Sequence, residues 1–142
     1  MANVLDIQIT QEGPRNAVVK LTGILDTSDI SEVPAIALQD FRNNDASSGP
    51  LIGLRVDLIE WSISQGMEVQ LAWDGYVPQQ IFPIAGRGRI YGANYGGFLP
   101  DRTRKNYNGN INLVTTGWAN SVSQGSTQNF TIILELVKLY GR

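Results

Sequence analysis

The 142-residue sequence contains no cysteine and no histidine. Without cysteine, the chain can form neither a disulfide framework nor a thiolate metal site. Without histidine, imidazole metal sites and the Ser-His-Asp and Cys-His catalytic arrangements are excluded as well. These two absences remove a large part of enzyme chemistry. We therefore expect a protein without enzymatic activity, without a cofactor and without a bound metal.

Long apolar runs are also lacking. No stretch approaches the ~18 consecutive apolar residues of a membrane span, and the N-terminal sequence MANVLDIQITQ has neither the basic start nor the apolar run of a signal peptide. We expect a soluble protein that is made in a cytoplasm and does not enter a membrane. Apolar residues make up 42% of the chain, which is enough for one sizeable core. The expectation is a single domain over residues 1–142.

Charge is distributed unevenly along the chain. The net charge is −2 and the sequence pI is about 5.0, which argues against a surface built to coat nucleic acid. Residues 1–74 hold eleven acids and four bases, whereas residues 75–142 hold seven bases and two acids. Five of those seven bases lie between positions 87 and 105, opposite a single acid, Asp101. A short basic segment therefore stands out in an otherwise acidic protein.

Apolar and polar residues alternate with the period of two that is typical of β-strands, and no convincing amphipathic helix is present. Eight segments carry this pattern or are compatible with it: residues 4–10, 16–25, 32–41, 51–64, 67–75, 79–86, 110–117 and 129–141. Residues 33–41 are compatible with a helix as well, because Pro34 could occupy a first helical turn. The sequence predicts an all-β protein, an antiparallel β-sandwich or jelly roll of about eight strands.

Two of these segments make more specific predictions. In residues 51–64 the apolar positions change parity near Leu58 and Ile59, which predicts a β-bulge that keeps both sets of side chains in one core. Ser64, Gln65 and Gly66 form a tight connection to the next strand. Segment 129–141 is apolar on both parities, so we expect it to be central or covered by a partner chain. The polar stretches 42–50 and 119–129 are expected to be a long turn and a mobile exposed loop.

The basic segment begins with GRGRIYGANYGG, residues 86–97. Its glycine spacing differs from the dinucleotide fingerprint and no Walker motif occurs in the chain, which disfavours a nucleotide site. Arginines interleaved with aromatic residues suit nucleic acid, but the acidic remainder of the chain argues against such a partner. A glycine-rich loop whose arginines are solvated or paired with acids is the simplest alternative. Glycines that permit close approach, arginines that fork onto carboxylates and rigid aromatic anchors also suit a protein contact.

Other candidate sites have weaker support. The carboxylate pairs Asp57 with Glu60 and Glu68 with Asp74 could serve a hydrolase, but a solvated strand face explains them more simply. The acids of DTSDISE, residues 26–32, could bind a calcium ion through their oxygen atoms, although a hydrogen-bonded turn explains the same residues. Trp61 and Trp73 have the inward parity of core residues. Trp118, beside the 119–129 loop, is the one tryptophan expected to form an exposed platform that could stack on a sugar ring.

Four stretches together resemble a known group of proteins: VKLTGILDTSD, RVDLIEWSISQGMEVQLAWDG, IYGANYGGFLP and GNINLVTTGWANSVSQGSTQNFTIILELVK. They are similar to small virion structural proteins of tailed bacteriophages, most of all to head decoration, or cement, proteins. The resemblance implies a β-sandwich or jelly roll that sits on the capsid surface of the virion, bound to the major capsid protein, often as a homotrimer. It implies reinforcement of the shell without chemistry.

The residues and the resemblance together lead to one functional expectation, a non-enzymatic decoration protein that bridges neighbouring capsid subunits. The expected partner-contact residues are those of the basic segment: Arg87, Arg89, Tyr91, Tyr95, Phe98, Arg102, Arg104 and Lys105. The alternative is a carbohydrate-binding module of a phage tail or baseplate that holds host glycans through Trp118. No nucleic acid or membrane partner is expected.

Overall fold

The computed structural model describes residues 3–42, 49–118 and 127–141. Those residues form nine β-strands, two short 3₁₀ helices and no α-helix: β1 (Val4–Glu12), β2 (Asn16–Leu25), β3 (Val33–Ile36), η1 (Leu38–Asp40), β4 (Leu51–Ile63), β5 (Glu68–Trp73), β6 (Gln79–Ala85), β7 (Arg87–Tyr91), η3 (Gly92–Tyr95), β8 (Ile111–Thr116) and β9 (Gln128–Tyr140). The predicted all-β class and sandwich architecture are confirmed.

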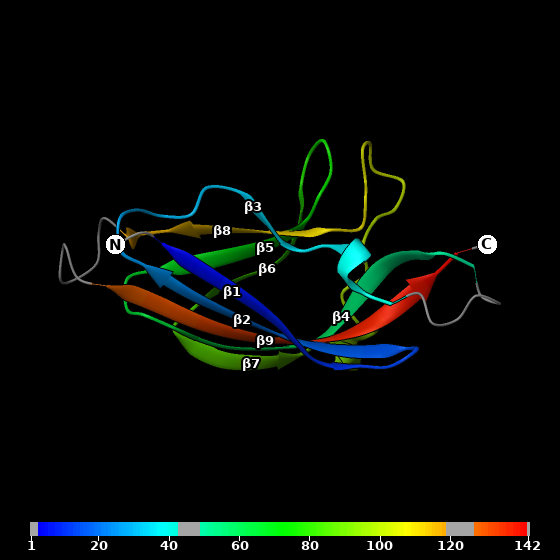
Figure 1. Ribbon diagram of the computed structural model, residues 1–142, viewed down its shortest axis with the longest axis horizontal. Helices are drawn as coiled ribbons and strands as arrows, with labels where there is room; N and C mark the ends of the chain where they lie inside the picture. The colour runs from blue at the N-terminus through cyan, green and yellow to red at the C-terminus, as the bar shows by residue number, and fades with distance from the viewer. Residues whose placement is uncertain (1–2, 43–48, 119–126, 142) are drawn as a thin grey trace.

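The strands form two antiparallel sheets that pack face to face (Figure 1). One sheet has the order β1-β2-β9-β4-β7, and the other has the order β3-β8-β5-β6. Of the eight connections between consecutive strands, two form hairpins within a sheet and six cross to the other sheet. The order β2-β9-β4-β7 over β3-β8-β5-β6 is that of a jelly roll. β1 adds a fifth strand beside β2.

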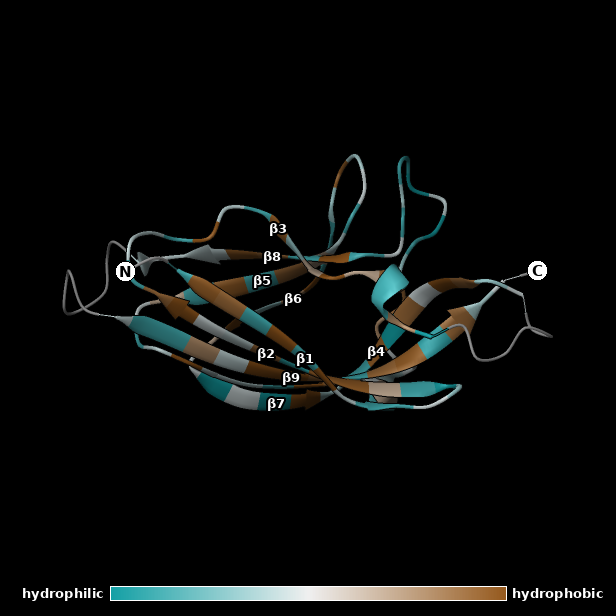
Figure 2. Cartoon of the chain, viewed as in Figure 1, coloured by the Kyte–Doolittle hydropathy of each residue, from teal (hydrophilic) through white to brown (hydrophobic). Residues whose placement is uncertain are grey.

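The core lies between the two sheets. Most inward side chains of the strands are apolar, and Figure 2 shows the resulting alternation of hydrophobic and hydrophilic positions. The largest fully buried side chains come from both sheets: Phe130, Leu21, Leu25, Ile36, Leu54, Ile59, Met67, Leu71, Ile111, Leu113, Ile132 and Leu134. Trp73 is 2% exposed, and Trp61 packs against the core while partly buried, so the inward parity predicted for both tryptophans is confirmed.

The change of parity predicted in β4, and the bulge that explains it, are confirmed. The β4–β9 register shifts between Val56 and Leu58, which leaves Asp57 as the extra residue of a bulge. Leu54 and Val56 before the bulge and Ile59 after it are all fully buried, although they differ in parity. Because the extra residue restores the inward direction, one long strand contributes to the core on both sides of the bulge.

β9 is central, as its sequence predicted. It lies between β2 and β4, and it forms ladders of ten and eleven residue pairs with these neighbours. Its inward residues are buried, whereas Ile133, Val137 and Leu139 on the outer face are partly exposed. The two-sided apolar character is therefore explained by a central position in the sheet.

The structure corrects three details of the prediction. Residues 86–97 are not a continuous loop, because β7 occupies Arg87–Tyr91 and is the ninth strand. Segment 32–41 divides into the strand β3 and the 3₁₀ helix η1. The connection at residues 64–66 is tight, with Gly66 at φ 88°, but it crosses between sheets, so β4 and β5 do not pair. Most of the predicted turn at 42–50 and of the loop at 119–129 lies outside the described residues.

Candidate interaction site

The structure divides the predicted contact residues between two separate places. Arg87, Arg89 and Tyr91 belong to β7, an edge strand of the five-stranded sheet. Ile90 alternates with them and pairs with the fully buried Ile59, so these three side chains lie on the outer face of that sheet. The remaining predicted residues follow β7 in η3 and in the segment before β8.

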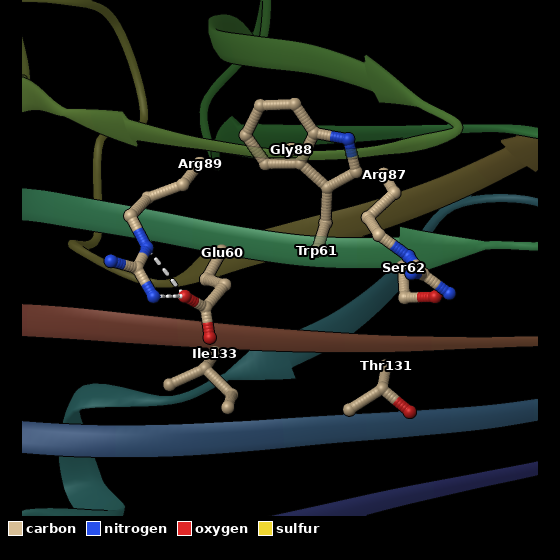
Figure 3. Close-up of a pocket in the computed structure, with 8 residues that line it drawn as sticks. All are labelled: Glu60, Trp61, Ser62, Arg87, Gly88, Arg89, Thr131 and Ile133. Carbon is tan, nitrogen blue, oxygen red and sulfur yellow. Dashed lines mark hydrogen bonds and ion pairs between the residues drawn. The ribbon is translucent and has the colours of Figure 1, made fainter.

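A hollow of about 420 Å³ lies on this outer face, beside β7. Figure 3 shows its lining side chains: Arg87 and Arg89 come from β7, Glu60 and Ser62 from β4, and Thr131 and Ile133 from β9. The ring of Trp61 points to the opposite side, into the sandwich, where it covers Gly88. The hollow therefore has a floor of small and aliphatic groups with guanidinium groups along its edge.

The two arginines of β7 have different electrostatic surroundings. Arg89 forms a salt bridge with Glu60 on the adjacent strand and donates a hydrogen bond to the Tyr91 hydroxyl at 3.0 Å. The hydrogen bond to Glu60 raises the pKa of Arg89 further above its ordinary value. The Arg87 side chain has no hydrogen-bonding or ionic partner among residues 3–42, 49–118 and 127–141. Arg87 therefore carries the positive charge on β7 that is available for a partner.

Tyr95 and Phe98, which were predicted together as rigid aromatic anchors, differ in their surroundings. Tyr95 is 76% exposed at the end of η3. Phe98 is partly buried: its ring lies 6.0 Å from that of Phe82, and its backbone forms two hydrogen bonds with Val56. The ring of Phe98 packs against the edge of the core, so less of it is available to a partner than of Tyr95. A side chain at Gly92 would collide with this ring, which explains the glycine there.

The second place is a projection formed by two connections, residues 74–78 between β5 and β6 and residues 99–110 before β8. Both extend away from the four-stranded sheet in Figure 1. Tyr76 N–H donates to the Lys105 carbonyl at 2.9 Å, and Asn108 donates through its side chain to Asp74 at 2.7 Å. Arg104 reaches the Val77 carbonyl at 3.4 Å. These bonds fasten the two connections to each other, and we call the pair the loop projection.

The loop projection presents apolar and cationic groups side by side. Tyr76 is 69% exposed and Val77 is 62% exposed, and the ammonium group of Lys105 lies 4.8 Å from the centre of the Tyr76 ring. Leu99, at the start of the second connection, is 52% exposed. Exposed aromatic and aliphatic groups beside cations are typical of protein contact surfaces.

Hydrogen bonds also hold the base of the loop projection. Asp101 accepts hydrogen bonds from the hydroxyl and backbone N–H groups of Thr103, which lower the pKa of the Asp101 carboxyl. Its own N–H donates to the Gln79 side chain at 2.6 Å. Tyr107 donates to the Ile52 carbonyl at 3.0 Å, and burial raises the pKa of this phenol. The exposed groups therefore stand on an ordered base.

Sequence reasoning missed Tyr76 and Val77. They lie in the turn DGYVP, which carries no positive charge and lies outside the basic segment. The available signal was a tyrosine and a valine in a turn that the strand pattern places between two strands, at the end of a sheet. The cation next to them, Lys105, comes from a segment almost thirty residues later, and only the fold brings the two together.

The weaker candidate sites do not assemble. Asp57 is paired with Arg55 and Glu60 with Arg89, while Glu68 and Asp74 lie at opposite ends of β5. The proposed calcium acids are held by separate partners: Asp29 accepts from Thr115 and Trp118, and Glu32 accepts from Asn112. Within the described ranges, no group of three or more potential metal ligands is present.

Trp118 is not an exposed platform. Its side chain is partly buried against the core, and its indole N–H donates to the Leu25 carbonyl at 3.3 Å. A different polar surface exists on the four-stranded sheet, where a hollow of about 200 Å³ is lined by Glu32, Gln70, Gln80 and Asn112, with Ala72, Pro78 and Val114. Amide and carboxylate groups of this kind hydrogen-bond well to hydroxyl groups.

No family model, curated protein or solved structure matches this chain. In the part of the chain that the structure describes, no helix has the length and apolar character needed to cross a membrane.

Proposed function

We propose that this protein is a non-enzymatic capsid decoration protein of a tailed bacteriophage. It binds the outer surface of the head as a homotrimer and reinforces the shell by bridging neighbouring subunits of the major capsid protein. The observation that carries the proposal is the loop projection, which combines exposed apolar side chains and cations on a base held by hydrogen bonds. The resemblance to head decoration proteins and the jelly-roll strand order support it.

The chemistry of the loop projection suggests its partner. Arg102, Arg104 and Lys105 are exposed, against the two acids Asp74 and Asp101 of the loop projection, and Arg104 lies 3.7 Å from Asp101. This excess of positive charge favours an acidic protein surface. Tyr76 supplies a rigid ring that can fill an apolar depression between the partner's carboxylates. A contact this small is weak by itself, so a trimer that engages several capsid subunits at once holds the head through avidity.

The test is attachment to heads assembled without this protein. Tyr76→Ser removes the ring, and Lys105→Glu reverses the charge beside it. Each change should lower occupancy on the heads about tenfold or more, in keeping with an aromatic or cationic anchor of an interface. Lys20→Glu is the matched control, because it reverses a charge on β2 of the other sheet. Unchanged occupancy of both projection variants would remove the loop projection from the capsid contact.

A carbohydrate-binding module is the second candidate, supported now by the polar hollow on the four-stranded sheet and not by Trp118. Its amide groups can donate and accept hydrogen bonds with sugar hydroxyls, and the Glu32 carboxylate can accept them. A glycan array separates the two candidates. Saturable binding that is abolished by Gln70→Ala and Asn112→Ala, together with full head occupancy of those variants, would favour the glycan-binding function.

A further inference from the structure

The five-stranded sheet ends in two strands of opposite charge. β1 is one edge and β7 is the other, and no described segment pairs with the outer side of either strand. β1 contains Asp6 and Glu12 and no base, whereas β7 contains Arg87 and Arg89 and no acid. An edge strand with unpaired backbone N–H and C=O groups is a template for pairing with another chain. These two edges are therefore complementary in charge as well as in backbone hydrogen bonding.

The available charges on the two edges lie in the same row of the sheet. The strand registers align Asp6 with Thr22, Thr131, Ser62 and Arg87 in turn. All five side chains project from the outer face. In the described residues neither the Asp6 carboxylate nor the Arg87 guanidinium has a hydrogen-bonding or ionic partner. By contrast, the second charge of each edge is already neutralised within the chain, since Glu12 is paired with Lys138 and Arg89 with Glu60.

The inward side chains of the two edges match as well. Ile7 lies on the inward parity of β1, yet it is 41% exposed, because β1 has no neighbour beyond it among the described residues. If a second copy continues the sheet in the same row, Ile7 lies beside Gly88 and Ile9 beside the partly buried Ile90. The junction therefore opposes apolar groups on the inward side and opposite charges on the outer side.

Two-fold pairings of the same edges are less favourable. If β7 pairs with β7 of another copy, Arg87 and Arg89 of one chain face those of the other, and like charges on opposed strands are destabilising. If β1 pairs with β1, Asp6 gains no cationic partner. The head-to-tail arrangement is the one that gives both available charges an opposite charge.

We propose that copies of this chain associate head to tail, with β7 of one copy pairing in parallel with β1 of the next. Parallel pairing follows because alternating directions along β1-β2-β9-β4-β7 make the two edge strands run the same way. A heterologous contact of this kind closes into a ring when the rotation between copies permits it. The inference rests on the homotrimer of the proposed function and identifies the strands that join its subunits.

Charge reversal tests the junction. Asp6→Arg and Arg87→Glu should each raise the dissociation constant of self-association about tenfold or more, because each places like charges at the junction. The double variant D6R/R87E should restore association, since the pair is then reversed and still complementary. Sedimentation velocity at low salt, with protein up to about 1 mM, suits a contact as small as one short strand pair. Glu135→Lys is the control, because it reverses an exposed charge on the central strand β9, two strands from either edge.

Covalent trapping gives a second readout, made simple by the lack of native cysteine. Gln8→Cys and Arg89→Cys place thiols opposite each other in the proposed register. Within one chain they lie four strand spacings apart, about 19 Å, which is too far for an intramolecular disulfide. Mild oxidation of the Q8C/R89C variant should therefore produce covalent dimers and larger species, whereas K20C/R89C, with one thiol on an interior strand, should not.

Either of two results would overturn the inference. In the first, the wild type stays monomeric at every concentration and the Q8C/R89C variant gives no covalent dimer. In the second, the single charge variants associate as the wild type does. Head attachment is measured separately. If the protein associates as proposed but does not bind heads, the proposed capsid function is wrong and the proposed β7–β1 junction is still supported.

Discussion

At the scale of single residues, close contacts decide which positions tolerate change. Gly23 on β2 is buried, and a Cβ placed there would lie 2.2 Å from the ring of Phe130 on β9. We expect Gly23→Ala to lower the free energy of unfolding by about 2 kcal/mol, because Phe130 must leave its place in a close-packed core. Gly13→Ala is the control, since its nearest neighbour is 3.8 Å away. Equal urea midpoints for the two variants would contradict the packing argument.

A buried ion pair makes a second prediction at this scale. The Lys138 side chain is fully buried and lies 2.8 Å from Glu12. Burial alone would raise the pKa of Glu12, but hydrogen bonds from Lys138 and from the Arg42 N–H outweigh it and lower that pKa below 4.5. A lowered pKa in the folded state means stabilisation that is present at neutral pH and lost as the pH falls below the ordinary value of this carboxyl.

Replacing one partner of this pair should therefore be costly at neutral pH. We expect Glu12→Gln to lower the free energy of unfolding by about 3 kcal/mol at pH 7, because it leaves a buried ammonium group without its counter-charge. Near pH 3 the difference should be much smaller. The double variant E12Q/K138M should recover much of the loss. Urea unfolding at both pH values measures all three, and a pH-independent cost would show that charge is not the cause.

At the scale of elements, the bulge in β4 sets which side chains enter the core. Ile59 is fully buried after the bulge, while its neighbour Leu58 is only partly buried. We expect Ile59→Ala to cost about 3 kcal/mol, as for buried aliphatic residues generally, and Leu58→Ala about 1 kcal/mol. Denaturant midpoints measured on both variants test this order. Without the bulge, Leu58 would point into the core in place of Ile59, and Leu58→Ala would be the more destabilising substitution.

The elements that the sequence predicted are those with a strong period of two. β4 shows its bulge in the sequence because three apolar residues on each parity flank the shift. β7 was missed for the opposite reason: its inward positions are Gly88 and Ile90, so only one apolar side chain marks the strand. It forms because β4 offers a free edge, and that edge depends on the whole sheet. Tyr76 beside Lys105 was missed likewise, because the contact joins distant segments.

At the scale of the whole molecule, the acidic and basic halves of the sequence do not become two halves of the protein. The central strand β9 comes from the basic half and lies between β2 and β4 of the acidic half. The charge asymmetry survives at the two edges of the five-stranded sheet, where β1 is acidic and β7 basic. A pattern that suggested a single charged docking face in the sequence is, in the fold, better suited to joining one copy to the next.

The loop projection contacts the head, whereas the edge strands β1 and β7 link copies and so provide avidity. Mutations in the two places should therefore have different effects. Arg87→Glu leaves the loop projection intact, so its first contact with a head should be unchanged. Its dissociation from heads should be about 100-fold faster than that of the wild type, because single copies lose the effective concentration that linked copies provide. The double variant D6R/R87E should return to slow dissociation. Raising the salt from about 0.1 to 1 M should speed dissociation of the wild type. The Debye length falls from about 10 Å to about 3 Å, so the attraction between exposed opposite charges is weakened.

Dissociation rates measured on immobilised heads test this prediction. Tyr76→Ser is the matched comparison, because it should slow or abolish attachment while leaving self-association unchanged. If Arg87→Glu is monomeric and still dissociates as slowly as the wild type, linked copies are not what holds the protein on the head. If D6R/R87E associates normally but dissociates rapidly, Arg87 contacts the capsid directly, and the basic strand serves the shell and not the neighbouring copy.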